Sequence, residues 1–586
     1  MLRSQGIKGP SYRFLHGSTK EILNMRKETM SRPMDLSHNI FPRVQPHIYS
    51  WLNMYRTNFV FWYGPKPQIV VTELEGKLLY KMAELQSIPK KGIVFTRKQY
   101  GLIGMGRLTK MKWKEKGIKG PSYRFLHGST KEILNMRKET MSRPMDLSHN
   151  IFPRVQPHIY SWLNMYRTNF VFWYGPKPQI VVTELEFVKE ILNNRDKVYQ
   201  TMDSEGFLKK LFGGGLVALD GEKWAHRRKL AHYAFHAESL KNMTPAMITS
   251  VEIMLERWKQ YKGKEIDVFE EFRQLTSDVI SRTAFGSSYL EGKDIFEMLM
   301  KLTNLMARNA FKIRLPALSL FFKSGDNIES EKLEQGIRDS IIKIIKKREK
   351  ATSGGLHNFG GDFLGLLLES NHNVDEGNRI TEQDMVDECK TFYIAGHETT
   401  TSLLSWTVLL LSIHTDWQEK ARQEVIKTFG QQLPTSDGIA RLKMMNMIIH
   451  ESLRLYPPVI ALLREVKREV KMGDIILPAN IKVHVPTLAL HHDTQIWGEN
   501  AHLFKPERFS EGVAKATNYN PAVYLPFGLG PRSCVGLNFA TNEAKITLSM
   551  ILQRYSFTLS PAYIHSPVPV LTISPQRGVQ MMLHAL

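Results

Sequence analysis

The stretch that most constrains this chain is Phe527–Gly536, which reads Phe-Gly-Leu-Gly-Pro-Arg-Ser-Cys-Val-Gly and precedes the helical pattern Leu537–Tyr555. Three glycines and a proline predict a tight loop, because glycine accepts backbone conformations that are closed to other residues. The loop contains Cys534, one of only two cysteines in the chain. Backbone amides and the positive end of the following helix would point at its sulfur and favour the thiolate. We therefore predict a thiolate that can bind a soft metal such as iron.

The spacing of this loop resembles the haem-binding loop of the cytochrome P-450 family, Phe-x-x-Gly-x-Arg-x-Cys-x-Gly. Every defined position of that pattern is filled, by Phe527, Gly530, Arg532, Cys534 and Gly536. The resemblance implies that Cys534 is the axial ligand of haem b and that the other four residues bind the cofactor. A lone cysteine beside a helix cap is more often a buried structural residue, so the interpretation depends on the further motifs below.

Composition places the chain among globular proteins and limits its partners. Hydrophobic residues make up 42% and charged residues 23% of the 586 residues. Two cysteines argue against a disulfide framework and indicate a reducing compartment. Residues 1–116 hold 21 basic and 7 acidic residues, or +14 of the net +22, which leaves +8 for the remainder. Such a moderately basic domain suits an acidic protein partner or an anionic membrane surface, and no nucleic-acid motif occurs in it.

The sequence shows neither a membrane anchor nor a signal peptide. No window reaches about 20 consecutive apolar residues, the length that a spanning helix needs. The best candidate, Ser402–Ile413, is too short and is interrupted by Ser405. The first residues are polar, unlike the apolar core of a signal peptide.

An internal repeat divides the chain. Residues Gly6–Glu75 recur without a change as Gly117–Glu186. A functional repeat array shows divergence and at least three units, so one perfect copy resembles a recent duplication or a faulty gene model. Only the second copy continues into the pattern that begins at Phe187, and the stretch Gly76–Lys116 is basic without sustained periodicity. We therefore assign 117–586 to the folded domain and 1–116 to an extension outside the core fold, and we expect deletion of 1–116 to leave haem binding intact.

Local patterns within 117–586 predict mostly helices with a few short strands. We expect a helix at 157–166, strands at 169–174 and 179–183, a helix at 187–193, amphipathic helices over 238–350, hairpin strands between 465 and 485 and strands in the tail 568–583. The glycine-rich stretch Leu211–Gly215 predicts a flexible loop. The basic run Lys343–Lys350 predicts a solvated helix face, and the turn near Ile564–Pro567 is expected to line a pocket.

Trp224 and Arg228 are four residues apart on a predicted helix whose first turn is Gly221-Glu-Lys, so they share one face. An arginine beside an indole donor is suited to hold a carboxylate. The resemblance implies that this Trp-x-x-x-Arg pair holds a haem propionate. Alone the pair is common on helix surfaces and carries little weight.

The longest helical pattern, Thr381–Ile413, contains Ala-Gly-His-Glu-Thr-Thr at 395–400. A glycine, an acid and hydroxyls inside a buried helix contradict local propensity, and such conflicts tend to mark functional sites. The segment matches the oxygen-activation motif of the family, which implies that Gly396 opens the helix beside a ligand, Thr399 hydrogen-bonds bound oxygen and Glu398 relays protons. The alternative is a buried helix whose hydroxyls bond back one turn. Cys389 is expected to be a small buried hydrophobic residue.

Glu451 and Arg454 form an ordinary i,i+3 pair on another predicted helix, and Arg508 follows in Pro-Glu-Arg-Phe. The resemblance implies a buried cluster of these three residues that fixes the cysteine loop, so we interpret them as structural. After Pro457-Pro458 the segment Val459–Leu463 is apolar and leads to Arg464. By resemblance the apolar part faces substrate and Arg464 faces a propionate.

Together the motifs imply a mainly α fold with a small β region that encloses haem b. The implied activity is oxygen insertion from O2 into an apolar, terpenoid- or hormone-like small molecule, with electrons from NADPH through a reductase that docks on the basic face. The motif sequences resemble plant microsomal members, in the clan of secologanin synthase and of hormone and triterpenoid oxidases. This implies the cytosolic face of the endoplasmic reticulum, where peripheral membrane contact is compatible with the absent anchor.

Two alternatives stay open at this point. Some relatives rearrange peroxides or dehydrate substrates without oxygen or reductase, although the acid–threonine pair argues against that chemistry here. The other alternative is an inactive, anchor-less product of a duplicated gene.

Overall fold

The computed structural model describes residues 19–31, 50–51, 54, 59–63, 66–70, 118–124, 127–175, 177–201, 206–261, 263–310, 324–352, 359–373 and 379–586. The chain divides into two compact units, Met1–Leu108 with Pro316–Leu318, and Thr109–Leu315 with Ser319–Leu586. Residues 76–116, for which the sequence predicts no sustained structure, lie outside the described residues.

The two copies of the repeat form the same local elements. In the first unit these are α1 (Thr19–Ser31), β1 (Phe59–Tyr63) and β2 (Lys66–Val70), and in the second unit they are α6 (Thr130–Ser142), β3 (Phe170–Tyr174) and β4 (Lys177–Val181). Both hairpins are antiparallel with equivalent registers. In the second unit, β4 also pairs in parallel with β10 (Lys482–Val485). The second copy is therefore part of a larger sheet.

That sheet has five strands in the order β3-β4-β10-β7-β5. Strand β7 (Leu462–Val466) pairs antiparallel with both β10 and β5 (Tyr199–Gln200). The sheet buries a small apolar core of its own, which includes Val171, Ile180 and Val483. It therefore ties the repeat segment to a strand that lies about 300 residues later in the sequence.

The other strands form two-stranded and three-stranded sheets. The pairs are β8 (Val470–Met472) with β9 (Ile475–Leu477) and β12 (Pro567–Pro569) with β13 (Ile573–Pro575), and the three-stranded sheet has the order β11 (Tyr555–Leu559), β14 (Gln580–Ala585), β6 (Glu265–Asp267).

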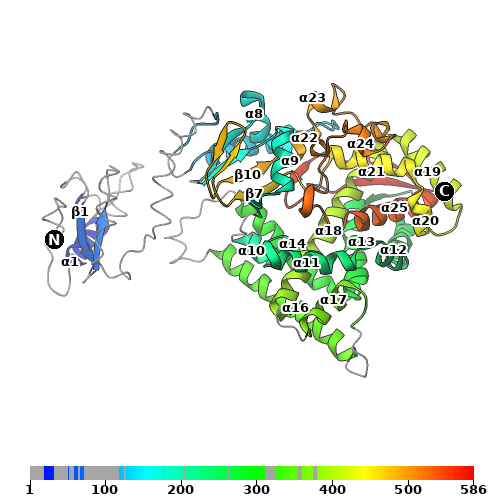
Figure 1. The fold of residues 1–586 in the computed structure, drawn as a ribbon, viewed down its shortest axis with the longest axis horizontal. Coiled ribbons are helices and arrows are strands. Elements are labelled where there is room, and N and C mark those ends of the chain that lie inside the picture. Colours follow the sequence, from blue (N-terminus) through cyan, green and yellow to red (C-terminus); the bar gives the residue numbers. More distant parts are fainter. Residues whose placement is uncertain are drawn as a thin grey trace. The chain divides into compact units, whose positions relative to one another are not determined.

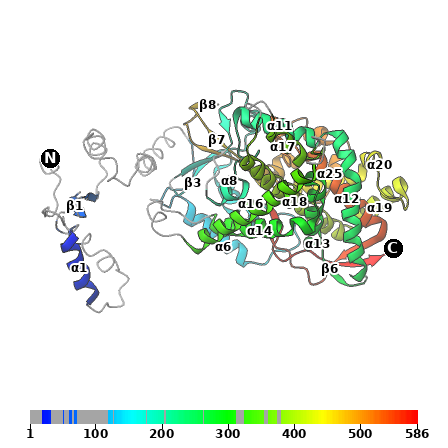
Figure 2. The ribbon, with the colours of Figure 1, turned by 90° about the horizontal axis from the view of Figure 1, so that it is seen from below.

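Helices form most of the second unit and surround its main apolar core. Besides α6 they are α7 (Phe152–Val155), α8 (Pro157–Tyr166), α9 (Leu185–Asn193), α10 (Phe207–Phe212), α11 (Gly221–Ala234), α12 (Ala237–Trp258), α13 (Val268–Phe285), α14 (Tyr289–Asn309), α16 (Gly325–Thr352), α17 (Phe363–Asn371), α18 (Glu382–Ile413), α19 (Thr415–Phe429), α20 (Ser436–Ala440), α21 (Lys443–Leu455), α22 (Thr487–His491), α23 (Thr494–Trp497), α24 (Val513–Ala516) and α25 (Leu537–Arg554). Figures 1 and 2 show the five-stranded sheet on one side of this unit and α12, α13 and α25 on the other. The mainly α fold with a small β region is confirmed.

Helix α18 runs through the middle of the helical part (Figure 1) and packs against α13, α21 and α25. Its 32 residues begin at a capping box, in which Thr381 and Asp384 bond each other's backbone amides. Most of its side chains are buried, on every face of the helix, and Cys389 is one of them. A helix that is buried all round belongs to the core, so α18 is the element against which the others are placed.

Most local predictions agree with the structure. The predicted helix 157–166 is α8, and the helix expected to start near Thr381 is α18 with Thr381 as its cap. The lysines of the run Lys343–Lys350 lie on an exposed face of α16, as predicted. The predicted strand 179–183 is shifted to Lys177–Val181, and Pro178 precedes the residues of β4 that pair with β10.

The prediction of a flexible loop at Leu211–Gly215 is wrong for its first residues. Leu211 and Phe212 end helix α10, and Leu211 is fully buried. The remaining glycines form a turn whose backbone is bonded by side chains of α18. Glycine content signalled flexibility, but here it permits close packing instead.

Among the described residues, no helix combines the length and the apolar character that a membrane span requires.

Candidate active site

The loop around Cys534 is closed by its own backbone. The Cys534 amide donates to the Phe527 carbonyl at 2.8 Å, and the Ser533 amide donates to the Gly530 carbonyl at 3.0 Å. Gly528 and Gly530 have φ angles of 75° and 74°, a region that favours glycine. A Cβ on Gly530 would lie 2.5 Å from the Leu192 carbonyl oxygen at the end of α9. The loop therefore needs glycine at 530 both for its conformation and for its contact with α9.

Gly536 plays a different part from the other two glycines. Its φ is −94°, which any residue adopts, and it stands at the N-cap of α25. Its backbone amide forms a hydrogen bond toward the Cys534 thiol that lowers the pKa of the thiol. A Cβ at this position would lie 3.9 Å from the sulfur, an ordinary contact.

Burial raises the pKa of the Cys534 thiol and outweighs the Gly536 amide and the nearby Arg228, which both lower it. The sequence predicted only the lowering influences. The thiol is nevertheless accessible. A free thiol in this setting keeps its proton near neutral pH, whereas a coordinated metal cation would remove it.

Three arginines meet beside this loop. Arg532 donates to the Leu219 carbonyl at 2.6 Å and to the Asp220 carboxylate. Its guanidinium stacks on Trp224 with 4.7 Å to the ring centroid. Arg228 donates to the Ser533 carbonyl at 2.7 Å, so the predicted Trp224–Arg228 face does lie against the cysteine loop.

Arg464, the third arginine, enters from strand β7. Burial lowers the pKa of Arg464 to about 10, with a further lowering by Arg532. Burial and the proximity of Arg228 likewise lower the pKa of Arg532. Asp220 is the carboxylate that opposes both of these shifts. This excess of positive charge suits a ligand that carries more than one anionic group.

The segment Ala395–Thr399 interrupts the burial of α18. Ala395 is exposed and Gly396, Glu398 and Thr399 are partly exposed, although the neighbouring turns are buried. The Thr399 hydroxyl donates to the Ala395 carbonyl at 2.6 Å, which is the backbone bond that the alternative interpretation expected. Burial raises the pKa of Glu398, so its carboxyl retains a proton more readily than an exposed one.

Helix α18 is continuous through Gly396. A Cβ there would lie 2.6 Å from Cδ1 of Ile280, so the glycine admits α13 at close range. His397, the next residue, is buried with its Nδ1 2.9 Å from the Thr276 hydroxyl and its Nε2 3.8 Å from the Glu398 carboxylate. Burial lowers the pKa of His397 to about 3, so it is neutral.

Glu451, Arg454 and Arg508 form the predicted buried cluster. Arg454 contacts Glu451 through two hydrogen bonds of 2.8 and 2.7 Å, and both side chains are fully buried. Arg508 lies 3.4 Å from the same carboxylate. Arg454 also donates to the carbonyls of His491 and Ala501. With these partners the charges are satisfied, which fits a structural role.

His491, which sequence reasoning missed, connects that cluster to the cysteine loop. Its carbonyl accepts from Arg454 and its Nε2 accepts from the Leu525 amide at 2.8 Å. Leu525 stands two residues before Phe527. Burial lowers the pKa of His491 to about 3, and a neutral ring can accept at Nε2. No local pattern announces this link, because its partners are far apart in sequence.

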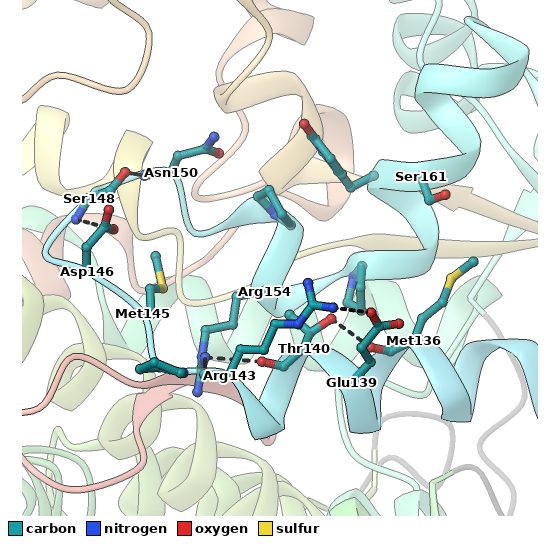
Figure 3. Close-up of a pocket in the computed structure, with 14 residues that line it drawn as sticks. Met136, Glu139, Thr140, Arg143, Met145, Asp146, Ser148, Asn150, Arg154 and Ser161 are labelled. Atoms are coloured by element: carbon teal, nitrogen blue, oxygen red, sulfur yellow. Dashed lines mark hydrogen bonds and ion pairs between the residues drawn. The ribbon is translucent and has the colours of Figure 1, made fainter.

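A pocket of about 610 Å³ lies elsewhere, between α6, α7 and α8 (Figure 3). Its wall includes Arg143, Arg154 and Tyr160. Arg143 pairs with Glu139, and Arg154 donates to the carbonyls of Thr140 and Arg143. None of the predicted site residues lines this pocket, so it is separate from the candidate site.

The sequence model of the cytochrome P450 family matches residues 154–576. The chain belongs to this family. It is 66% identical to Cytochrome P450 CYP749A22 of Panax ginseng over 477 residues, which cover 81% of this chain and 91% of that protein. It is 43% identical to the 11-oxo-beta-amyrin 30-oxidase of Glycyrrhiza uralensis over 80% of this chain and 91% of that protein. It is 39% identical to Cytochrome P450 734A1 of Arabidopsis thaliana over 80% of this chain and 91% of that protein.

As a cytochrome P450 the chain is a monooxygenase that uses haem b with a cysteine thiolate ligand and receives electrons that originate from NADPH. The residues present fit this group. An accessible thiol in a closed loop suits the iron, and the excess of arginines beside it suits the two carboxylates of haem b. When bound, the haem supplies the activation of O2.

Proposed function

We propose that this cytochrome P450 oxidises an apolar triterpenoid- or hormone-like molecule, and that Cys534 is the ligand of its haem iron. The observation that carries the ligand assignment is the contrast between the two cysteines. Cys534 is accessible and receives the Gly536 amide, whereas Cys389 is 1% exposed within α18. Burial raises the pKa of Cys389 above the usual range of a thiol. Only Cys534 therefore offers a sulfur that a large cofactor can reach.

The arginines supply the second part of the proposal. Arg228, Arg464 and Arg532 bind the propionate carboxylates, and Trp224 holds the Arg532 guanidinium flat. Asp220 and the Leu219 carbonyl fix the direction of Arg532. Phe527 and Gly530 shape the loop, and the buried Glu451 cluster supports it through His491.

Helix α18 supplies the proton-transfer groups. Burial raises the pKa of Glu398, so its carboxyl keeps a proton to higher pH than an exposed glutamate does. The Thr399 hydroxyl, now bonded to the Ala395 carbonyl, can rotate to donate toward the reacting oxygen. The accessible surface of Ala395 gives an apolar ligand room beside these groups. General acids positioned in this way accelerate reactions about 10²–10⁴-fold.

The substrate class rests on relatives and on apolar lining. The name of the Glycyrrhiza uralensis relative describes the oxidation of a triterpenoid. In this chain Val459 is 37% exposed just before β7, in the segment that resemblance places against substrate. An NADPH-dependent reductase and the cytosolic face of the endoplasmic reticulum complete the proposal, both by analogy with plant microsomal members.

The deciding experiment is the carbon monoxide difference spectrum of the reduced protein, for wild type, Cys534→Ser and Cys389→Ser. We expect the red-shifted Soret band of thiolate-ligated haem in wild type and Cys389→Ser, and its loss in Cys534→Ser. Retention of the band in Cys534→Ser would exclude that residue as ligand.

The substrate part is tested with the wild-type protein, NADPH and a reductase, against triterpenoids and steroid hormones. We expect an oxygenated product that depends on both NADPH and O2. Conversion without electrons would instead indicate a rearrangement enzyme.

A further inference from the structure

Buried charged residues occupy the first half of α18, where the proposed chemistry does not use them. Asp387, Glu388 and Lys390 are 9%, 1% and 2% exposed. Burying charged groups is costly unless specific partners compensate them. Their partners therefore indicate what these residues do.

Asp387 pairs with Lys390 at 3.0 Å on the same helix, and Glu388 lies 3.7 Å from Arg227 of α11. Further partners of these residues are backbone groups of one neighbouring segment. The Asp387 carboxylate accepts from the Gly214 amide at 2.8 Å, and the Glu388 carboxylate accepts from the Leu216 amide at 3.1 Å. A turn further along, the Thr391 hydroxyl donates to the Phe212 carbonyl at 3.2 Å. We refer to residues Gly213–Asp220 as the strap.

The glycines of the strap make this contact feasible. A Cβ on Gly213 would lie 2.0 Å from a carboxylate oxygen of Asp387, and a Cβ on Gly215 would lie 2.3 Å from the Thr391 hydroxyl. The glycine run that suggested a flexible loop is thus the surface on which α18 rests.

The other end of the strap reaches the cysteine loop. The Leu219 carbonyl and the Asp220 carboxylate both accept from Arg532, and Asp220 also accepts from the Thr201 amide. The first residues of the strap are therefore hydrogen-bonded to α18, and the last two residues of the strap are hydrogen-bonded to Arg532. It then continues directly into α11, which carries Trp224 and Arg228.

We propose that Asp387 and Glu388 are positioning residues for the anionic edge of the haem, which they influence through the strap and Arg532. This inference rests on the proposed function, in which Arg532 binds a propionate. Neither carboxylate touches the cofactor in this proposal. Loosening the end of the strap that is bonded to α18 should nevertheless weaken haem retention.

Glu388 should make the effect depend on pH. Burial raises the pKa of Glu388 to about 7. The groups that face it are Arg227 of α11, whose Nε lies 3.7 Å from its carboxylate, and Asp384, Asp387 and Cys389 of α18. Above this pKa a carboxylate accepts strongly from the Leu216 amide, and below it a neutral carboxyl accepts weakly. Haem retention should therefore weaken as the pH falls through about 7.

The first measurement is hydrogen exchange of the Gly214 and Leu216 amides in the holoprotein at pH 8. Glu388→Gln should accelerate Leu216 exchange several-fold, and Asp387→Asn should do the same for Gly214. Glu382→Gln is the matched control, because Glu382 lies on the same helix in an exposed pair with Arg338. Glu388→Gln should not lower the melting temperature at pH 8. The raised pKa of Glu388 means that its ionised form destabilises the folded state at that pH, and the variant removes this charge.

The second measurement is the rate of haem transfer to apomyoglobin between pH 6 and 8. We expect the wild-type rate to rise several-fold as the pH falls, and the Glu388→Gln rate to stay near the low-pH value throughout. Faster exchange at Leu216 with an unchanged transfer rate would overturn the positioning role. The positioning role would also be overturned if hydrogen-exchange protection of the wild-type Leu216 amide, corrected for intrinsic exchange, stayed constant between pH 6 and 8. A wild-type protein without thiolate-ligated haem would instead contradict the proposed function.

Discussion

At the scale of single residues, Arg454 shows how strongly one buried charge depends on its partners. It donates twice to Glu451 and once each to the backbone carbonyls of His491, Ala501 and Leu503, and it has no exposed surface. Removing one partner of a buried pair leaves the other charge uncompensated, at a cost of about 3–5 kcal/mol. Arg454→Met should lower the free energy of unfolding by about that amount, measured by urea denaturation.

The control for Arg454 is Arg338→Met. Arg338 is partly exposed and pairs with the exposed Glu382 at 3.2 Å. Exposed pairs contribute about 0–1 kcal/mol, so this variant should stay near wild type. Equal losses in the two variants would contradict a special role for the buried cluster.

Glu398 carries a second residue-scale prediction. Glu398→Gln keeps the shape of the side chain but cannot release an acidic proton. Product formation should fall about 10²-fold, the low end of the range for a general acid, with an unchanged carbon monoxide spectrum. Because burial raises the pKa of Glu398, wild-type activity should also decline as the pH rises through that pKa, and the variant should lack this decline.

The rate of product formation across pH, with NADPH consumption followed in parallel, is the quantity to measure for Glu398. Glu382→Gln serves again as the control on the same helix. An active Glu398→Gln protein with the wild-type pH profile would show that another group supplies the proton.

At the scale of an element, the cysteine loop depends on glycine for two distinct reasons. Gly528 and Gly530 share nearly the same φ, so alanine at either position carries backbone strain of about 1–2 kcal/mol. Only Gly530 is also pressed against α9, with the Leu192 carbonyl 2.5 Å from where its Cβ would be. Gly530→Ala should therefore destabilise the protein by about 1–3 kcal/mol more than Gly528→Ala.

Thermal unfolding of the two glycine variants, with haem content measured in parallel, tests that difference. Around Gly528 the nearest atoms would lie 3.7 Å or more from an added Cβ. Similar melting temperatures for both variants would mean that α9 moves away easily and does not support the loop.

At the scale of the whole molecule, the second copy of the repeat belongs to the larger sheet through the β4–β10 pairing. Residues Met1–Leu108 belong to a separate compact unit. A chain that begins at Gly117 should therefore give the same carbon monoxide difference spectrum per mole of protein as the full chain. Loss of the spectrum in this shorter chain would assign the first unit a role in folding.

A chain that begins at Phe187 is the matched control for that deletion. It lacks both copies, and with them β3, β4 and the buried Ile133 and Trp162. We expect it to yield no folded haem protein. A normal spectrum here would show that neither copy is needed.

Local patterns predicted much of this protein. The ends of α8, the cap of α18 and the glycines of the cysteine loop follow from residues that are neighbours along the chain. The site residues came from motif spacing and family resemblance, which locate residues but not their contacts. The structure adds that Arg532 stacks on Trp224, that Arg228 bonds Ser533 and that Gly396 packs on Ile280.

What the sequence by itself determined is local: helix periods, caps, turn chemistry and the spacing around Cys534. Only the tertiary structure decided that burial raises the pKa of the Cys534 thiol against the pull of its helix end. It also decided that the strap is held by α18, and that His491 joins the Arg454 cluster to Leu525. These features depend on desolvation and on hydrogen bonds between backbone and side-chain groups far apart in the chain. Such interactions leave no periodic signal in the sequence, because any residue can offer the backbone group that they use.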